Sequence, residues 1–297
     1  MFGDRDLALR ALAVLLPPRS GYALTVRATE RLGGARRAHV AAAVRAAASE
    51  LLGDRDLADA AARGFVASIA CDDLDALTAF AWPESLRLRG LDVEGELPAR
   101  GPAVFVSFHI GGGFRIFDVL RRAGLRPTFL CAPPRGGWTR YQRAIAGARL
   151  RYLARTLERP FVFTGKGARA TLEEHLEGGG AVVGLLDVAP ATLGLRDASE
   201  GELFGRRLTL PVGLLRLACQ VGAAVVPYDG RIEGGRRVLR LHPRAASSDP
   251  QPLLAELLAV FARLIRERPA DWQAWLELET LFATGAAGEA AGLVAGA

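Results

Sequence analysis

Residues 103–118 read AVFVSFHIGGGFRIFD, in which a short apolar run is followed at once by a histidine and three consecutive glycines. The run from Ala103 to Phe108 is rich in valine and phenylalanine and predicts a buried β-strand. The segment near residues 113–123 has the apolar spacing of a helix. A strand, a glycine turn and a helix in this order are typical of an α/β domain.

The same alternation continues along the chain after Pro83. Strands are predicted over 86–93, 103–108, 127–131, 161–164, 181–186 and 223–227, and helices near 113–123, 138–157, 167–177 and 211–221. Residues 228–242 predict two strands joined by a Glu-Gly-Gly turn, and two helices follow over about 251–267 and 270–283. These segments predict an α/β fold with a mixed, largely parallel sheet flanked by helices.

The first 82 residues have a different pattern. Apolar residues recur there at spacings of three and four, as in Val40, Val44, Ala47 and Leu51, and no strand is indicated. Glycines separate these stretches, which predicts three or four helices. We therefore expect an N-terminal helical arm over 1–82, an α/β domain over 83–285 and a flexible tail over 286–297.

Composition excludes several classes of protein. The chain has 297 residues, of which 50% are hydrophobic and 24% charged, and this excludes a disordered chain or a disulfide scaffold. A formal net charge of +6 is too modest to predict a nucleic-acid partner. The three cysteines lack metal-site or redox spacing, and neither a signal peptide nor a membrane span is evident. We expect a cytoplasmic protein whose membrane contact, if any, is peripheral at the inner face of the cell membrane.

Two residues lie just after predicted strands, where ligands bind in open α/β sheets: His109 and Asp187. A neutral imidazole at a strand end can take a proton from a hydroxyl or an amine. The turn Gly111–Gly113 has no side chains, so a substrate can approach its backbone, and free N–H groups can face an anion. The alternative interpretation is that His109 merely ends a strand and the glycines only permit a tight turn.

Four blocks of sequence, taken in order, resemble the lysophospholipid acyltransferase superfamily, specifically its lipid A lauroyl/myristoyl acyltransferase branch. The resemblance covers roughly residues 5–283. The blocks are SFHIGGGFRIFDVL (107–120), GGGAVVGLLDVAP (178–190), GELFGRRLTLPVGLLRLACQVGAAVVPYDGRIEGG (201–235) and RPADWQAWLELETLF (268–282).

The resemblance implies a glycerolipid-acyltransferase-like fold and a defined chemistry. A fatty acyl group would pass from an acyl carrier protein or coenzyme A thioester to a hydroxyl or amine of an amphipathic lipid or secondary-metabolite acceptor, with no metal and no cofactor beyond the acyl donor. His109 would be the general base, and the glycine turn would shape the thioester site. The implied substrate-binding residues are Gly111, Gly112, Gly113, Asp187, Phe204, Gly205 and Arg206.

One position departs from the family pattern. The family places an acid five positions after the histidine to orient the imidazole, and this chain has Phe114 there. Asp118 lies one helical turn further along the same face and is our candidate for the orienting acid. Asp187 could approach from its own strand instead, or His109 could act alone. A degenerate relative that binds acyl chains or scaffolds a partner is the alternative function.

Two further features leave alternatives open. Arginines make the segment around 138–157 basic, so it could dock an acidic carrier protein or anionic headgroups, or it could simply be a solvated helix face; they are Arg135, Arg140, Arg143, Arg149, Arg151 and Arg155. An unrelated Rossmann-like binding protein is a second rival, which the absence of a GxGxxG motif after any strand disfavours.

Overall fold

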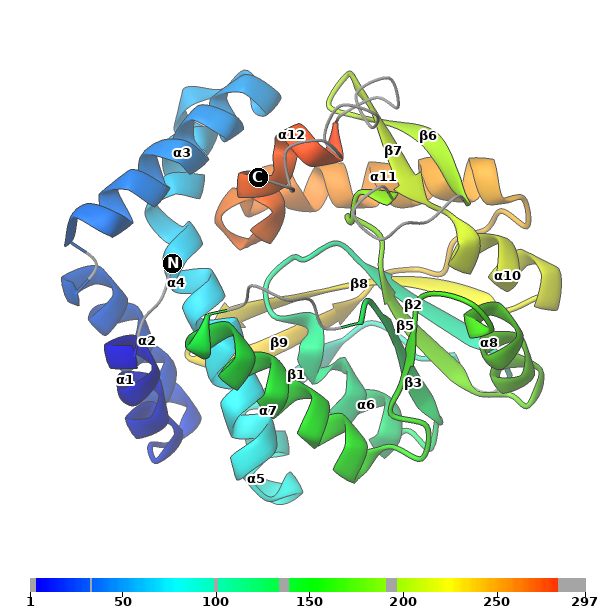
Figure 1. Ribbon diagram of the computed structural model, residues 1–297, viewed down its shortest axis with the longest axis horizontal. Helices are drawn as coiled ribbons and strands as arrows, with labels where there is room; N and C mark the ends of the chain where they lie inside the picture. Colours follow the sequence, from blue (N-terminus) through cyan, green and yellow to red (C-terminus); the bar gives the residue numbers. More distant parts are fainter. Residues whose placement is uncertain (1–3, 33, 99–100, 134–138, 191–196, 283–297) are drawn as a thin grey trace, which may run out of the picture.

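The structure is a computed structural model that describes residues 4–32, 34–98, 101–133, 139–190 and 197–282. Its centre is a seven-stranded sheet of order β1-β9-β8-β2-β5-β3-β4 (Figure 1). The strands are β1 (Leu91–Glu94), β2 (Ala103–Ser107), β3 (Pro127–Cys131), β4 (Phe161–Phe163), β5 (Ala181–Leu185), β8 (Ala224–Glu233) and β9 (Arg236–Leu241). The five strands from β8 to β4 are parallel, while β9 is antiparallel to β8. The predicted α/β fold with a mixed, largely parallel sheet is confirmed.

Helices cover both faces of this sheet, so β2 is buried along its whole length. Val104 and Val106 of β2 share a core with helices α8 (Ala168–Glu177), α10 (Gly213–Val221) and α11 (Pro250–Glu267). Phe105 points the other way and shares a core with α6 (Ile116–Arg122) and α7 (Arg140–Thr156). Because a strand covered on both faces needs apolar side chains on both, it appears in the sequence as a continuous apolar run.

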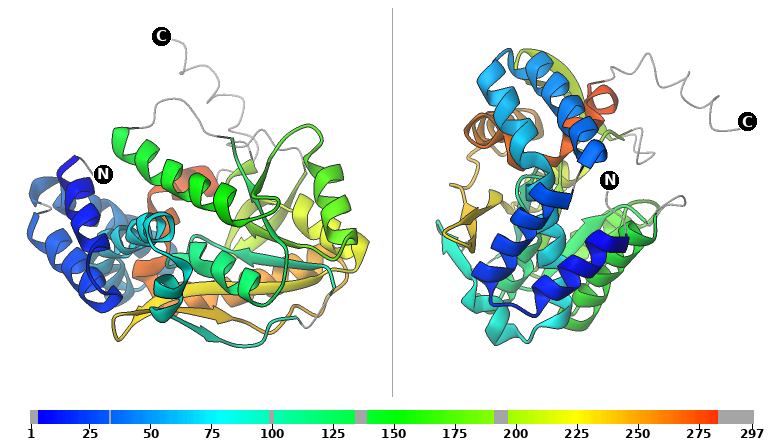
Figure 2. Two further views of the ribbon diagram at one scale, coloured as in Figure 1. Left: turned by 90° about the horizontal axis from the view of Figure 1, so that it is seen from below. Right: turned by 90° about the vertical axis from the view of Figure 1, so that its left-hand side faces the viewer.

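Four helices lie in the described part of residues 1–82, where three or four were predicted: α1 (Asp4–Val14), α2 (Pro18–Leu32), α3 (Gly34–Leu52) and α4 (Arg55–Ala81). They lie side by side at one end of the molecule (Figures 1 and 2). The longest, α4, begins after Asp54, whose carboxylate accepts hydrogen bonds from two backbone N–H groups of its first turn. No described helix combines the length and apolarity that a membrane crossing requires. The predicted boundaries of arm and tail stay predictions, and residues 286–297 lie outside the described residues.

Buried ion pairs join α4 to the α/β part. Asp72 contacts Arg149 of α7 at 2.7 Å, and Asp75 contacts Arg237 of β9 at 2.6 Å. Asp75 and Arg237 are almost fully buried, and buried charges are tolerated only when they are paired. The arm therefore supplies carboxylates that positive residues near the sheet require.

The strand predicted over 86–93 is wrong in its first half. Residues Glu84–Arg89 form helix α5, and β1 begins only at Leu91. The alternation of leucine and arginine is typical of an exposed strand, yet Arg87 points inward, where it donates to the Trp82 carbonyl and contacts Asp118. Long-range pairing of Arg87 thus overrides the local pattern.

The helix predicted over 270–283 is also wrong. The chain forms two short 3-10 helices, η2 (Pro269–Asp271) and η3 (Gln273–Glu277), and one helical turn, α12 (Leu278–Leu281). The Gly111 N–H donates to the Asp271 carbonyl at 2.9 Å, and the Gln273 N–H donates to the His109 carbonyl at 2.8 Å. Because these backbone groups pair with the histidine loop, they are not free to bond within a helix.

A hairpin that the sequence analysis does not predict joins β6 (Ala198–Leu203) to β7 (Arg206–Pro211). Its turn is Phe204–Gly205, and both residues have positive φ, 55° and 75°. A two-residue hairpin turn of this kind favours glycine because other side chains are strained there. The predicted strands over 223–227 and the start of 228–242 prove to be one strand, β8, and the predicted glycine turn follows it.

Candidate active site

His109 and Asp187 meet beyond the ends of two neighbouring strands. Strands β2 and β5 pair in parallel, so the residues that follow them emerge at the same edge of the sheet. The His109 Nδ1 lies 2.8 Å from an Asp187 carboxylate oxygen, and the His109 backbone N–H donates to both carboxylate oxygens at 3.0 and 2.9 Å. Nε2 of the imidazole has no hydrogen-bond partner among the described residues. The imidazole is therefore held through one nitrogen, and its other nitrogen is left for a substrate.

Trp272 completes the support of the carboxylate. Its indole N–H donates to Asp187 at 3.0 Å, and its backbone bridges Ile110. Trp272 and Asp187 are almost completely buried, whereas 38% of the His109 side chain is exposed. A fixed, buried carboxylate behind a reachable imidazole is the arrangement that orients a histidine general base. Trp272 belongs to a block used for the resemblance, but its sequence context does not reveal this contact.

The prediction that Asp118 orients His109 is wrong. The Asp118 carboxylate is buried among Arg87 at 2.9 Å, Arg115 at 2.9 Å and the Tyr152 hydroxyl at 2.7 Å. Burial alone raises the pKa of Asp118, but the two guanidinium groups and the tyrosine bond outweigh it, and the net pKa is lowered. Asp187, the alternative acid, is the carboxylate that contacts the imidazole. The substrate-binding role predicted for Asp187 stays a prediction.

Phe114, which stands where the resembled family has an acid, packs among aromatic rings. Its ring lies 5.4 Å from that of Tyr152 and 5.5 Å from that of Phe117, both edge-on, with the Arg149 guanidinium 5.9 Å from its centroid. The side chain also lines a cavity beside His109. The carboxylate that contacts His109 is that of Asp187, which follows β5.

The glycine turn is packed against other parts of the chain. Gly111 and Gly112 have φ of 58° and 72°, and a Cβ atom at Gly111 would lie 2.0 Å from the Gly230 carbonyl oxygen of β8. Arg237 donates to the Gly111 carbonyl at 2.9 Å and so anchors the turn from the other side. Glycine is therefore required at Gly111 by close packing. Gly112 and Gly113 line a cavity, and their contact with a substrate stays a prediction.

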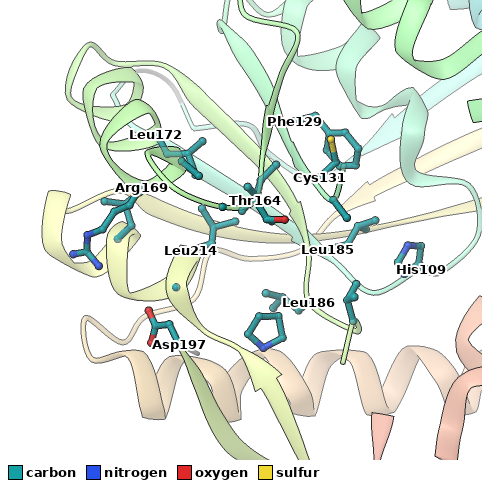
Figure 3. Close-up of a pocket in the computed structure, with 18 residues that line it drawn as sticks. His109, Phe129, Cys131, Thr164, Arg169, Leu172, Leu185, Leu186, Asp197 and Leu214 are labelled. Atoms are coloured by element: carbon teal, nitrogen blue, oxygen red, sulfur yellow. The ribbon is translucent and has the colours of Figure 1, made fainter. Parts of the chain in front are cut away.

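Two cavities meet at His109. The larger has a volume of about 510 Å³ and is lined mainly by leucine, phenylalanine, alanine and valine; His109 lies on one side of it, and Arg169 and Asp197 lie on the opposite side (Figure 3). The smaller, of about 230 Å³, has more polar residues in its wall: Asp72, Ser107, Arg149, Tyr228 and Gln273. Small-molecule sites are typically mostly apolar hollows with a few polar groups. The imidazole can thus reach ligands from both sides.

The structure does not bring Phe204, Gly205 and Arg206 to this site. They form the turn of the β6–β7 hairpin and line neither of the two cavities. Arg206 contacts Glu50 at 2.7 Å, and its guanidinium lies 4.8 Å from the centroid of the Phe282 ring. Their predicted contact with substrate has no support in this geometry.

The basic segment of α7 is divided between two environments. Arg149 faces inward and pairs with Asp72, whereas Arg151 and Arg155 are exposed and lie over the Phe80 ring at 5.0 and 5.6 Å. Arg135 lies outside the described residues. Docking of an acidic carrier protein on this helix stays a prediction.

Asp187 is the main group that raises the pKa of His109. Burial lowers the pKa of the imidazole, but the charge and the hydrogen bond of Asp187, with smaller contributions from Glu277 and Asp72, raise it above 6.5 overall. The His109–Asp187 pair therefore stabilises the fold fully at pH values below the pKa that His109 has in the unfolded chain. This stabilisation is lost as the pH rises through the pKa of His109 in the folded protein.

This electrostatic account predicts an NMR titration. In the wild type, the His109 imidazole should titrate above 6.5, and in Asp187→Asn its pKa should fall because the neighbouring negative charge is gone. His175, which contacts backbone carbonyls of Arg126 and Ala181, serves as an internal reference whose pKa should not change. An unchanged His109 pKa in the variant would contradict the assignment.

The sequence matches no protein-family model and no curated protein. Within the described ranges, no three His, Cys, Asp or Glu side chains gather as a metal site.

Proposed function

We propose that this protein is an acyltransferase of the lysophospholipid acyltransferase type. It would move a fatty acyl group from an acyl carrier protein or coenzyme A thioester to a hydroxyl or amine of an amphipathic acceptor. The observation that carries the proposal is the 2.8 Å contact between His109 Nδ1 and Asp187, with the imidazole bordering two cavities. If the His109 side chain pointed away from the apolar cavity, the alternative function would be favoured, that of a protein that binds acyl chains without transferring them.

The proposed reaction needs one proton carrier. His109 Nε2 takes the proton of the acceptor hydroxyl as its oxygen attacks the thioester carbonyl carbon, and Asp187 stabilises the imidazolium that forms. The tetrahedral intermediate then collapses, the carbon–sulfur bond breaks, and the leaving thiolate takes the proton from His109. The products are an ester, or an amide for an amine acceptor, and a free thiol.

The lining of the two cavities suits two different substrates, the acyl chain in the larger cavity and the polar acceptor in the smaller one. An acyl chain gains most from the larger cavity, because apolar burial contributes about 0.8 kcal/mol for each CH₂ group. The smaller cavity offers Asp72, Arg149 and Gln273 to a polar acceptor. The thioester carbon would then lie beside His109, where the cavities meet.

This assignment predicts how acyl-chain preference can be changed. Ala168 begins α8 and lines the larger cavity, so a tryptophan there should fill part of the space and shift the preferred thioester to shorter chains. Rates over a series of thioesters of increasing chain length measure the shift. Ala170→Trp, on the exposed face of the same helix, is the matched control. An unchanged preference in Ala168→Trp would mean that the acyl chain lies elsewhere.

Mass spectrometry can identify the acyl donor and the acceptor of the proposed reaction. The purified protein is incubated with acyl carrier protein and coenzyme A thioesters together with extracted lipids or hydroxyl and amine acceptors. We expect an acylated product and one equivalent of free thiol for each acyl group transferred. Binding of thioesters without thiol release would instead favour the degenerate relative.

A further inference from the structure

Tyr228 differs from the other tyrosines of the chain in the use of its hydroxyl. Tyr22, Tyr141 and Tyr152 each donate to a buried carboxylate, that of Asp75, Asp73 and Asp118, respectively. Tyr228 is 2% exposed, and its hydroxyl has no hydrogen-bond partner within the described part of the chain. Tyr228 lines the smaller cavity, and its hydroxyl is not one of the fully enclosed polar atoms, so it is free to hydrogen-bond a ligand there.

Tyr228 borders the smaller cavity together with His109, Gly112 and Gly113. A Cβ atom placed on Gly113 would lie 2.8 Å from the Tyr228 ring and 3.4 Å from its hydroxyl oxygen. The hydroxyl is therefore next to the backbone of the glycine turn, in the wall of the same cavity that His109 lines. Strand β8 holds it there, because the residues that flank Tyr228, Pro227 and Asp229, are buried in the same strand.

The environment keeps this hydroxyl protonated. Burial raises the pKa of Tyr228 above its ordinary value, and the negative charge of Asp72 raises it further. The group is thus a hydrogen-bond donor throughout the neutral range. It is unsuited to act as a base, a role that His109 already fills.

We propose that Tyr228 is a catalytic residue that donates a hydrogen bond to the oxyanion of the tetrahedral intermediate. The inference rests on the proposed acyl transfer. When the acceptor attacks, the π electron pair of the thioester carbonyl moves onto its oxygen, and the Tyr228 hydroxyl, which keeps its own proton, stabilises that negative charge. On collapse the pair returns to the carbon–oxygen bond, the carbon–sulfur bond breaks, and the thiolate takes the proton from His109.

Tyr228→Phe tests the role of the hydroxyl while keeping the ring that packs in the core. Loss of one preorganised oxyanion donor is expected to lower kcat about 10²- to 10³-fold, with a much smaller change in KM. The His109 pKa, measured by NMR, should stay at its wild-type value, because Asp187 and Asp72 are unchanged. A Tyr228→Phe variant with wild-type kcat would overturn the proposal.

A binding measurement tests the same hydroxyl without turnover. Dodecylphosphonate carries an oxyanion at a tetrahedral centre on an alkyl chain, and calorimetry should show that Tyr228→Phe binds it about 10- to 100-fold more weakly than the wild type does. Tyr152→Phe is the matched control. It also loses a buried hydroxyl, but one that bonds Asp118, so its melting temperature should fall while its Kd for the phosphonate stays unchanged.

The outcomes separate this inference from the proposed function. Equal phosphonate affinity in wild type and Tyr228→Phe would overturn the role of Tyr228, and acyl transfer that is lost in His109→Ala would still support the transferase. A wild-type protein that neither binds the phosphonate nor consumes any thioester would overturn both.

Discussion

Asp187→Asn is expected to lower the rate of acyl transfer by about 10⁴-fold at neutral pH. The carboxylate contacts His109 Nδ1 at 2.8 Å and is itself held by the Trp272 indole at 3.0 Å. An asparagine keeps the size but not the charge, so it neither stabilises the imidazolium nor reliably holds the tautomer that leaves Nε2 free to accept a proton. Steady-state rates at saturating thioester measure the effect.

The control for this variant is an acid outside the site. Asp59→Asn removes an exposed carboxylate that pairs with Arg45, and its rate should be that of the wild type. Circular dichroism and melting curves must show that Asp187→Asn remains folded. A folded Asp187→Asn variant with less than a tenfold loss would show that the carboxylate does not orient the base.

Asp118→Asn is expected to destabilise the fold by about 3–5 kcal/mol, because it removes the carboxylate that pairs with the buried Arg87 and leaves the buried Arg115 with only Asp75, at 3.9 Å. The total free energy of unfolding of natural domains is only about 5–15 kcal/mol, so this is a large loss of stability. The pKa of Asp118 is lowered in the folded state, so its contribution is present at neutral pH and is lost as the pH falls through the folded value. The stability of Asp118→Asn should therefore lack the part of the wild-type pH dependence that comes from protonation of Asp118.

Urea unfolding between neutral and acidic pH measures both effects. The fraction of Asp118→Asn that remains folded should keep the wild-type His109 pKa, because Asp118 does not contact the imidazole. A variant that is fully stable yet loses acyl transfer would contradict the structural role and return Asp118 to the candidates for the orienting acid.

The contrast between Asp118 and Asp187 shows how far sequence reasoning reaches at this site. Helical spacing predicts Phe114 and Asp118 on one helix, but Phe114 lies in a 3-10 helix, η1 (Gly113–Arg115), and Asp118 lies in α6. Arg87, which binds Asp118, lies 31 positions earlier. Asp187 is 78 positions from His109, and only the parallel pairing of β2 with β5 brings the two together. Because ligands bind beyond the carboxyl ends of strands in open α/β sheets, both His109 and Asp187 are predicted as site residues. This rule does not predict that their side chains contact each other.

The fold shows the same limit. Buried strands such as β2 and β5 are predictable because both faces demand apolar residues. Arg87 and the segment around Trp272 are not, because their conformation is set by partners distant in sequence: Asp118 for the first and the histidine loop for the second. Tyr228 was missed for the same reason, since only the structure reveals that its hydroxyl lacks the carboxylate partner that the other tyrosines have.

The general-base role of His109 is tested by following acyl-product formation by wild type and His109→Ala side by side, by mass spectrometry with the same thioester and acceptor. We expect product from the wild type and a loss of about 10²- to 10⁴-fold in the variant, with folding and acyl-chain binding preserved. Equal rates in the two proteins, or tight acyl binding with no thioester consumed by either, would show that His109 is not the base of an acyl transfer.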